Sequence, residues 1–177
     1  MILAKLFATL FLSVISIQSC QSSAGGRGAL IDRWETENKG LRIRITEYRE
    51  AQPVFLTHFY YVLESMPAGG SEWREVMAFK HDDDVSMHDQ VRFVDEGIAY
   101  GFMGWMYAVT TDGGKNWFIW SAERGLPNWE CCNYRLIADV SMAKDGTGLM
   151  KLNAIQGRRG EVPELHTNDY GRHWRAK

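Results

Sequence analysis

The sequence has little net charge, no clear helical periodicity and no recognisable catalytic motif. Its 177 residues carry 20 Lys and Arg against 22 Asp and Glu, a formal net charge of -2 at pH 7. Because no basic field is present to attract nucleic acid, we expect no nucleic-acid partner. No segment combines a helical period with capping residues, which argues against a helical protein. A phosphate-binding loop and a Gly-x-Ser-x-Gly elbow are also absent, so the sequence predicts no enzyme, no catalytic residues and no cofactor.

The sequence has only three cysteines, and the first of them, Cys20, ends a predicted export signal. Lys5 precedes an apolar run over residues 6–17, which is too short for a spanning helix and typical of a secretory signal. The run ends at Ile17-Gln18-Ser19-Cys20, which resembles a bacterial lipobox. We therefore expect a lipoprotein signal peptide at 1–19, lipidated Cys20 with a flexible tether at 20–30, and a single domain at 31–177. This predicts a periplasmic domain, lipid-anchored to a bacterial membrane and most simply the outer membrane; ordinary cleavage that leaves Cys20 without a role is the alternative.

The remaining groups that could bind metal or form a disulfide are few. Cys131 and Cys132 are adjacent, so a disulfide between them requires a distorted backbone; two free thiols or pairing with a partner chain are the alternatives. The acidic run Asp82, Asp83 and Asp84 is the best candidate for Ca²⁺. Consecutive Asp side chains point in different directions and no EF-hand spacing is present, so a solvated acidic turn is favoured and no metal site is predicted.

Strand patterns fill most of the rest of the chain. Apolar and polar residues alternate over 41–46, as in a half-buried strand. Turn residues at short intervals separate the further β-like runs, which predicts an all-β antiparallel meander. These runs are 54–63, 73–79, 91–94, 97–102, 106–111, 117–121, 134–142, 148–155, 164–166 and 174 onward.

One eight-residue motif occurs twice. Residues 110–117 and 167–174 share a hydroxyl residue, an Asp, a Gly and a Trp at matching places: Thr110, Asp112, Gly114 and Trp117, then Thr167, Asp169, Gly171 and Trp174. The Asp can fold back onto N–H groups of its own turn, the Gly supplies a positive φ, and the Trp begins the return strand. A weaker copy at 66–73 keeps only Gly and Trp. The three tryptophans are spaced by 44 and 57 residues, a period typical of four-stranded units.

The motif resembles the Asp-box, or BNR repeat, of sialidase-like β-propellers and is similar to the repeats of photosystem II assembly factor-like proteins. The resemblance implies three to four β-propeller-blade-like sheets with Asp-box hairpins. A closed propeller has four to eight blades, so a small, open or incomplete propeller is expected. Sialidase activity does not follow, because it needs an arginine cluster, a Tyr nucleophile and a proton donor spread over more blades.

Two aromatic segments are the candidate partner-binding loops. Phe102, Met103 and Trp105 lie where a polar hairpin tip is expected, so we interpret them as exposed anchors, with burial over one end of the domain as the alternative. A second loop contributes Arg124, Trp129 and Glu130, with packing of Trp129 over the neighbouring sheet as the alternative. We therefore predict a noncatalytic protein-binding lipoprotein, with an immunity protein against a secreted type VI effector enzyme as the most concrete form. The alternatives are a carbohydrate or cell-wall binding protein, a remnant glycosidase, and an assembly factor for an envelope complex.

Overall fold

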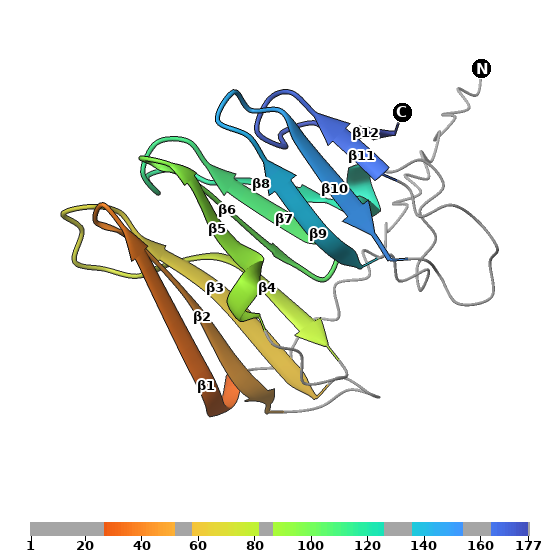
Figure 1. Ribbon diagram of the computed structural model, residues 1–177. Helices are drawn as coiled ribbons and strands as arrows, with labels where there is room; N and C mark the ends of the chain where they lie inside the picture. Colours follow the sequence, from red (N-terminus) through yellow and green to blue (C-terminus); the bar gives the residue numbers. More distant parts are fainter. Residues whose placement is uncertain (1–26, 52–57, 82–86, 126–135, 154–163, 177) are drawn as a thin grey trace, which may run out of the picture.

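The strands form three antiparallel sheets, each a meander of four consecutive strands (Figure 1). The computed structural model describes residues 27–51, 58–81, 87–125, 136–153 and 164–176. The first sheet contains β1 (Arg27–Asn38), β2 (Leu41–Glu50), β3 (Phe59–Met66) and β4 (Arg74–His81). The second contains β5 (Val91–Asp95), β6 (Ile98–Met103), β7 (Met106–Thr110) and β8 (Phe118–Ser121). The third contains β9 (Ile137–Met142), β10 (Gly148–Leu152), β11 (Glu164–Thr167) and β12 (Arg175–Ala176).

The predicted all-β class is confirmed, and none of the three sheets closes into a barrel. Two single-turn helices, η1 (His88–Gln90) and α1 (Ala122–Gly125), are the helical elements of the described residues. None of the described helices has the length and apolar character that crossing a bilayer requires. The first strand begins at Arg27, so residues 27–30 of the expected tether belong to the first sheet.

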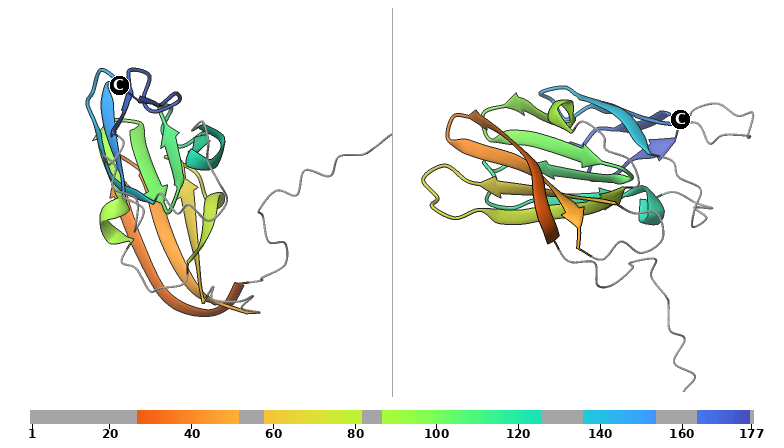
Figure 2. Two further views of the ribbon diagram at one scale, coloured as in Figure 1. Left: turned by 90° about the vertical axis from the view of Figure 1, so that its right-hand side faces the viewer. Right: turned by 90° about the horizontal axis from the view of Figure 1, so that it is seen from below.

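The second sheet lies between the other two, and each of its faces covers a core (Figures 1 and 2). The core against the first sheet includes Ile43, Leu63, Phe79, Ala99, Met103 and Ala108. The core against the third sheet includes Tyr100, Phe102, Tyr107, Val140, Met150 and Leu165. Burial of such side chains is worth about 1.5–3 kcal/mol each, so these two layers hold the stack together.

This sandwiched position corrects the prediction of an exposed tip at Phe102 and Met103. The two side chains are only 3% and 0% exposed, because β6 runs through Met103 and sends alternate side chains into the two cores. A strand buried on both faces is a nearly continuous apolar run, and we had interpreted the end of the strand predicted over 97–102 as an exposed tip. The turn itself is reduced to Gly104 and Trp105.

The two outer faces of the stack are polar. On the first sheet Arg44 donates two hydrogen bonds to Glu64, at 2.7 and 3.1 Å, and its guanidinium lies 4.2 Å from the ring centre of Trp73. On the third sheet, the exposed residues that alternate with the core positions are Ser141, Lys151, Glu164 and Arg175. Polar outer faces are what terminal repeats of a stack require, so both ends are capped by their own side chains.

In every sheet the turn between strands one and two lies at the same end as the turn between strands three and four. Gly40, Gly97 and Gly146 occupy the first of these turns with φ of 85°, 71° and 84°. Lys39 pairs with Glu96, and Lys144 pairs with Asp95, so the turns of neighbouring sheets are joined in a row. The repeated motif forms the second kind of turn, which places all its copies at this end of the stack.

Candidate functional site

The first motif forms a hydrogen-bonded turn between β7 and β8. The Thr110 hydroxyl donates to Asp112 Oδ1 at 3.0 Å and accepts from the Gly114 N–H at 3.0 Å. Asn116 donates its backbone N–H to Asp112 Oδ1 at 2.9 Å and its side-chain amide to Oδ2 at 2.8 Å. The Asp carboxylate therefore closes the turn from inside, as the sequence predicted.

The second motif repeats this turn between β11 and β12 with the same bonds. The Thr167 hydroxyl donates to Asp169 Oδ1 at 2.7 Å and accepts from the Gly171 N–H at 3.0 Å. The His173 backbone N–H donates to Asp169 Oδ1 at 3.0 Å, and its ring Nδ1 lies 2.6 Å from Oδ2. Two stretches of similar sequence thus build the same local structure in two sheets.

The hydrogen bonds also set the charge state of both carboxylates. Desolvation alone would raise the pKa of Asp169, but the bonds from His173 and Thr167 outweigh it and lower the pKa to about 2. In the first motif desolvation again opposes the bonds from Asn116 and Thr110, and the net result is a lowered pKa of Asp112. Both groups are stable anions whose acceptor positions are largely occupied within the turn, which fits a structural role.

The two motif tryptophans each anchor their sheet to the preceding one, but in different ways. Trp117 donates its Nε1–H to Ser65 Oγ at 2.9 Å. Trp174 packs edge-on against Tyr107 at 5.4 Å, and its Nε1 has no hydrogen-bond partner among the described residues. The difference follows from the sequence of the sheet that each Trp contacts. The residue just before the repeat is Ser65 in the first sheet and Val109 in the second. Only the serine offers an acceptor.

The residues predicted to bind a partner do not form one exposed surface. Phe102 and Met103 are core residues. Trp105 is half-buried, meets Phe79 edge-to-face at 4.8 Å, and its carbonyl accepts from the Ala122 N–H at 2.9 Å. Arg124 is exposed on α1.

Several predicted residues lie outside the described part of the chain. They are Cys20, Asp82, Asp83, Asp84, Trp129, Glu130, Cys131 and Cys132. Among the residues that are described, no group of three or more His, Cys, Asp or Glu side chains is placed to hold a metal ion.

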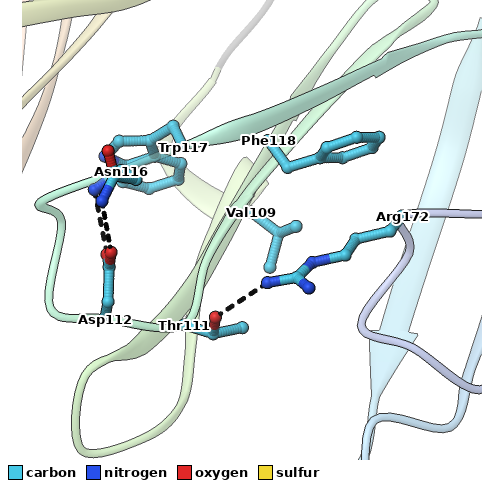
Figure 3. A pocket seen from close by; sticks show the side chains of 7 residues that line it. All are labelled: Val109, Thr111, Asp112, Asn116, Trp117, Phe118 and Arg172. Carbon is cyan, nitrogen blue, oxygen red and sulfur yellow. Dashed lines mark hydrogen bonds between the residues drawn. The ribbon is translucent and has the colours of Figure 1, made fainter.

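In the described part of the chain, a cavity of about 240 Å³ opens beside the first motif and is the candidate site (Figure 3). Its lining residues are Val109, Thr111, Asp112, Asn116, Trp117, Phe118 and Arg172. Figure 3 shows Asp112 with Asn116 on one side and Arg172 with Phe118 on the other. Arg172 comes from the second motif and donates to Thr111 Oγ1 at 3.2 Å, so the two repeated turns meet at this cavity.

Exposed apolar side chains on β8 adjoin the cavity. Phe118 is 40% exposed and Ile119 is 44% exposed, while Trp120 is buried in the core against the third sheet. The sequence predicted a strand over 117–121, but we did not expect the side chains of Phe118 and Ile119 to be exposed. The available signal was the unbroken apolar run from Trp117 to Trp120, since neighbouring strand residues point to opposite faces and a short edge strand cannot bury both.

Neither Phe118 nor Arg172 was among the residues singled out from the sequence. Arg172 occupies the place of Lys115 in the repeat, where a basic residue has no role in the turn. Its position beside the cavity depends on how the second and third sheets pack, which the spacing of the motifs does not specify. Comparison of the chain with protein-family models, with curated proteins and with solved structures found no match, so none of the three assigns it to a family.

Proposed function

We propose that the chain is a noncatalytic binding protein that engages a protein partner through the edge of its second sheet. The observation that carries this proposal is the exposure of Phe118 and Ile119 beside a cavity with charged walls. Exposed apolar groups rimmed by polar ones are typical of interaction surfaces. We assign a supporting role to the rest of the described structure. The polar groups of its turns are hydrogen-bonded within the turns, and charged side chains on its outer sheet faces form ion pairs.

The sheets are proposed to be Asp-box blades of an open, propeller-like stack. Three successive four-stranded meanders, with equivalent turns at one end, support this interpretation. The polar outer faces favour an open stack over a closed ring, since closure would bury them against another sheet.

The cellular setting is proposed from the N-terminal sequence. A lipidated Cys20 would hold the domain at a bacterial membrane, facing the periplasm. An inhibitor of a secreted effector enzyme is the form of partner binding that we favour there, because an inhibitor needs a rigid scaffold and no catalytic group.

The test is capture of a partner from periplasmic extract by the full chain, immobilised in detergent. The wild-type chain should retain a stoichiometric protein, and Ile119→Asp should release it by placing a charge at the apolar edge. The matched control is Leu30→Asp, since Leu30 is 53% exposed on β1 of the first sheet. Equal retention by the wild type and both variants would refute the proposed edge.

Carbohydrate binding is the second candidate function. The cavity combines the rings of Trp117 and Phe118 with hydrogen-bonding groups of Asn116 and Arg172, a set that can stack on and bond to a sugar. Saturable binding of a monosaccharide or cell-wall fragment, abolished by Phe118→Ala, would favour this function over a protein partner.

A further inference from the structure

The strand β8 is unlike the other sheet edges of the described structure. Six strands lie at sheet edges: β1, β4, β5, β8, β9 and β12. Five of them contain charged residues, whereas β8 consists of Phe118, Ile119, Trp120 and Ser121. Charged residues and proline are the usual means by which proteins prevent a sheet edge from pairing with another chain. The edge at β8 has neither.

The backbone of β8 and the side chains on its two faces are arranged so that a further strand can pair with it. β8 is hydrogen-bonded to β7 on one side, and alternate N–H and C=O groups of an edge strand point outward on the other. Phe118 lies on the face toward the third sheet, as does the buried Trp120, and Ile119 lies on the opposite face. An added strand would place its own side chains against Phe118 on one face and Ile119 on the other.

The cavity adds a charge preference. Arg172 makes no ion pair with a described residue and donates one hydrogen bond, to Thr111, which leaves most of its donors available. The nearby carboxylate of Asp112 already accepts three hydrogen bonds from Thr110 and Asn116. A carboxylate entering beside Phe118 would therefore find an unpaired guanidinium, which binds carboxylates with two parallel hydrogen bonds.

We propose that β8 is extended by one strand from an extended, acidic segment of a partner protein. Its apolar side chains cover Phe118 and Ile119, and one Asp or Glu side chain enters the cavity to pair with Arg172. The inference rests on the proposed function and specifies the chemistry of the partner at that site. Main-chain hydrogen bonds supply affinity in such strand addition, and the side-chain pockets supply specificity.

The test is a selection from a phage-displayed library of random heptapeptides, with the full chain in detergent as bait. The wild type should enrich an acidic residue flanked by β-branched or aromatic residues. Arg172→Glu should reverse the preference toward Lys or Arg, because the charge in the cavity is reversed while the strand edge is kept. Arg175→Glu is the matched control, since Arg175 is paired with His166 on the outer face of the third sheet and should leave the acidic preference unchanged.

A second measurement separates strand addition from other binding modes. In the enriched peptide, N-methylation at alternate residues should weaken binding at least about tenfold, while methylation at the intervening residues should be tolerated, since only every other N–H faces β8. Failure to enrich any peptide, or a preference that Arg172→Glu leaves unchanged, would overturn the inference. Loss of a captured partner on Ile119→Asp would still support the proposed function in that case. If peptide enrichment instead depends on self-association of the chain, the site would be assigned to a second copy. If a monosaccharide displaces the bound peptide, the site would be assigned to a glycan.

Discussion

At the level of single residues, the two motifs differ at the group that faces the second oxygen of the Asp. Asn116 donates an amide to Asp112, whereas the ring nitrogen of His173 faces Asp169. Both arrangements supply the same two contacts, one from the backbone and one from the side chain. The Asp therefore determines the turn, and the fourth residue after it adjusts how strongly the carboxylate is held.

Acidification should weaken the fold through Asp169. Its pKa is about 2 in the folded chain, against an ordinary value of 3.8, so the folded state favours the ionised form. The stabilisation is fully present above pH 3.8 and is lost as the pH falls toward 2. We expect the thermal midpoint to fall between about pH 4 and pH 2, measured by circular dichroism.

The variant Asp169→Asn isolates this contribution. The variant should have a lower free energy of unfolding than the wild type at pH 5. This difference should narrow as the pH approaches 2, because the wild-type carboxyl becomes protonated and is then uncharged like the amide. Glu164→Gln, which removes an exposed carboxylate from the neighbouring strand β11, controls for the change in net charge. A constant difference between wild type and Asp169→Asn over this range would contradict the assigned role.

At the level of elements, the glycines of the first motif have separable roles. Gly113 and Gly114 have φ of 72° and 82°, so a side chain is strained at either place. A Cβ on Gly113 would meet no atom within 4 Å, whereas on Gly114 it would lie 2.5 Å from Leu41 Cδ1 of the first sheet. In the second motif Tyr170 occupies the place of Gly113 with φ of 61°, which agrees with a position open to side chains.

Alanine substitution should distinguish the two positions. Gly113→Ala should cost about 1 kcal/mol, from the left-handed backbone alone. Gly114→Ala should cost about 2–4 kcal/mol, because the contact between turn and first sheet must also open. Urea denaturation of both variants measures the difference. Equal losses would mean that the turn does not press against Leu41.

The same elements indicate how much of the fold could be predicted from the sequence. The strands with one buried face, such as β2, alternate and were recognised, and the repeated turns were recognised by their fixed spacing. The long first strand β1 was missed because its twelve residues are mostly exposed and its apolar residues do not alternate with polar ones. The central strand β6 was predicted over 97–102, but its end at Phe102 and Met103 was interpreted as an exposed tip, since a strand covered on both faces loses the alternation that shows where a strand ends.

At the level of the whole molecule, the candidate site was beyond the reach of the sequence. The cavity forms where the second motif meets the first, so it depends on the distance between two sheets and not on the order of residues within either. Phe118 and Arg172 become neighbours of one cavity only after the sheets have stacked. The sequence could show that both turns exist; it could not show that they touch.

The polar outer faces predict that the stack does not close by pairing with a second copy. Two copies would supply six sheets, a number within the range of closed propellers. Such a ring would press the exposed Arg42–Glu35 pair against the exposed Lys151 and Glu164, and desolvating these charges opposes association. Sedimentation equilibrium of the full chain in density-matched detergent should therefore give the mass of one chain at micromolar concentration. A dimer abolished by Ile119→Asp would place self-association at β8, whereas a dimer that survives Ile119→Asp and dissociates on Lys151→Glu would show that the outer faces do meet.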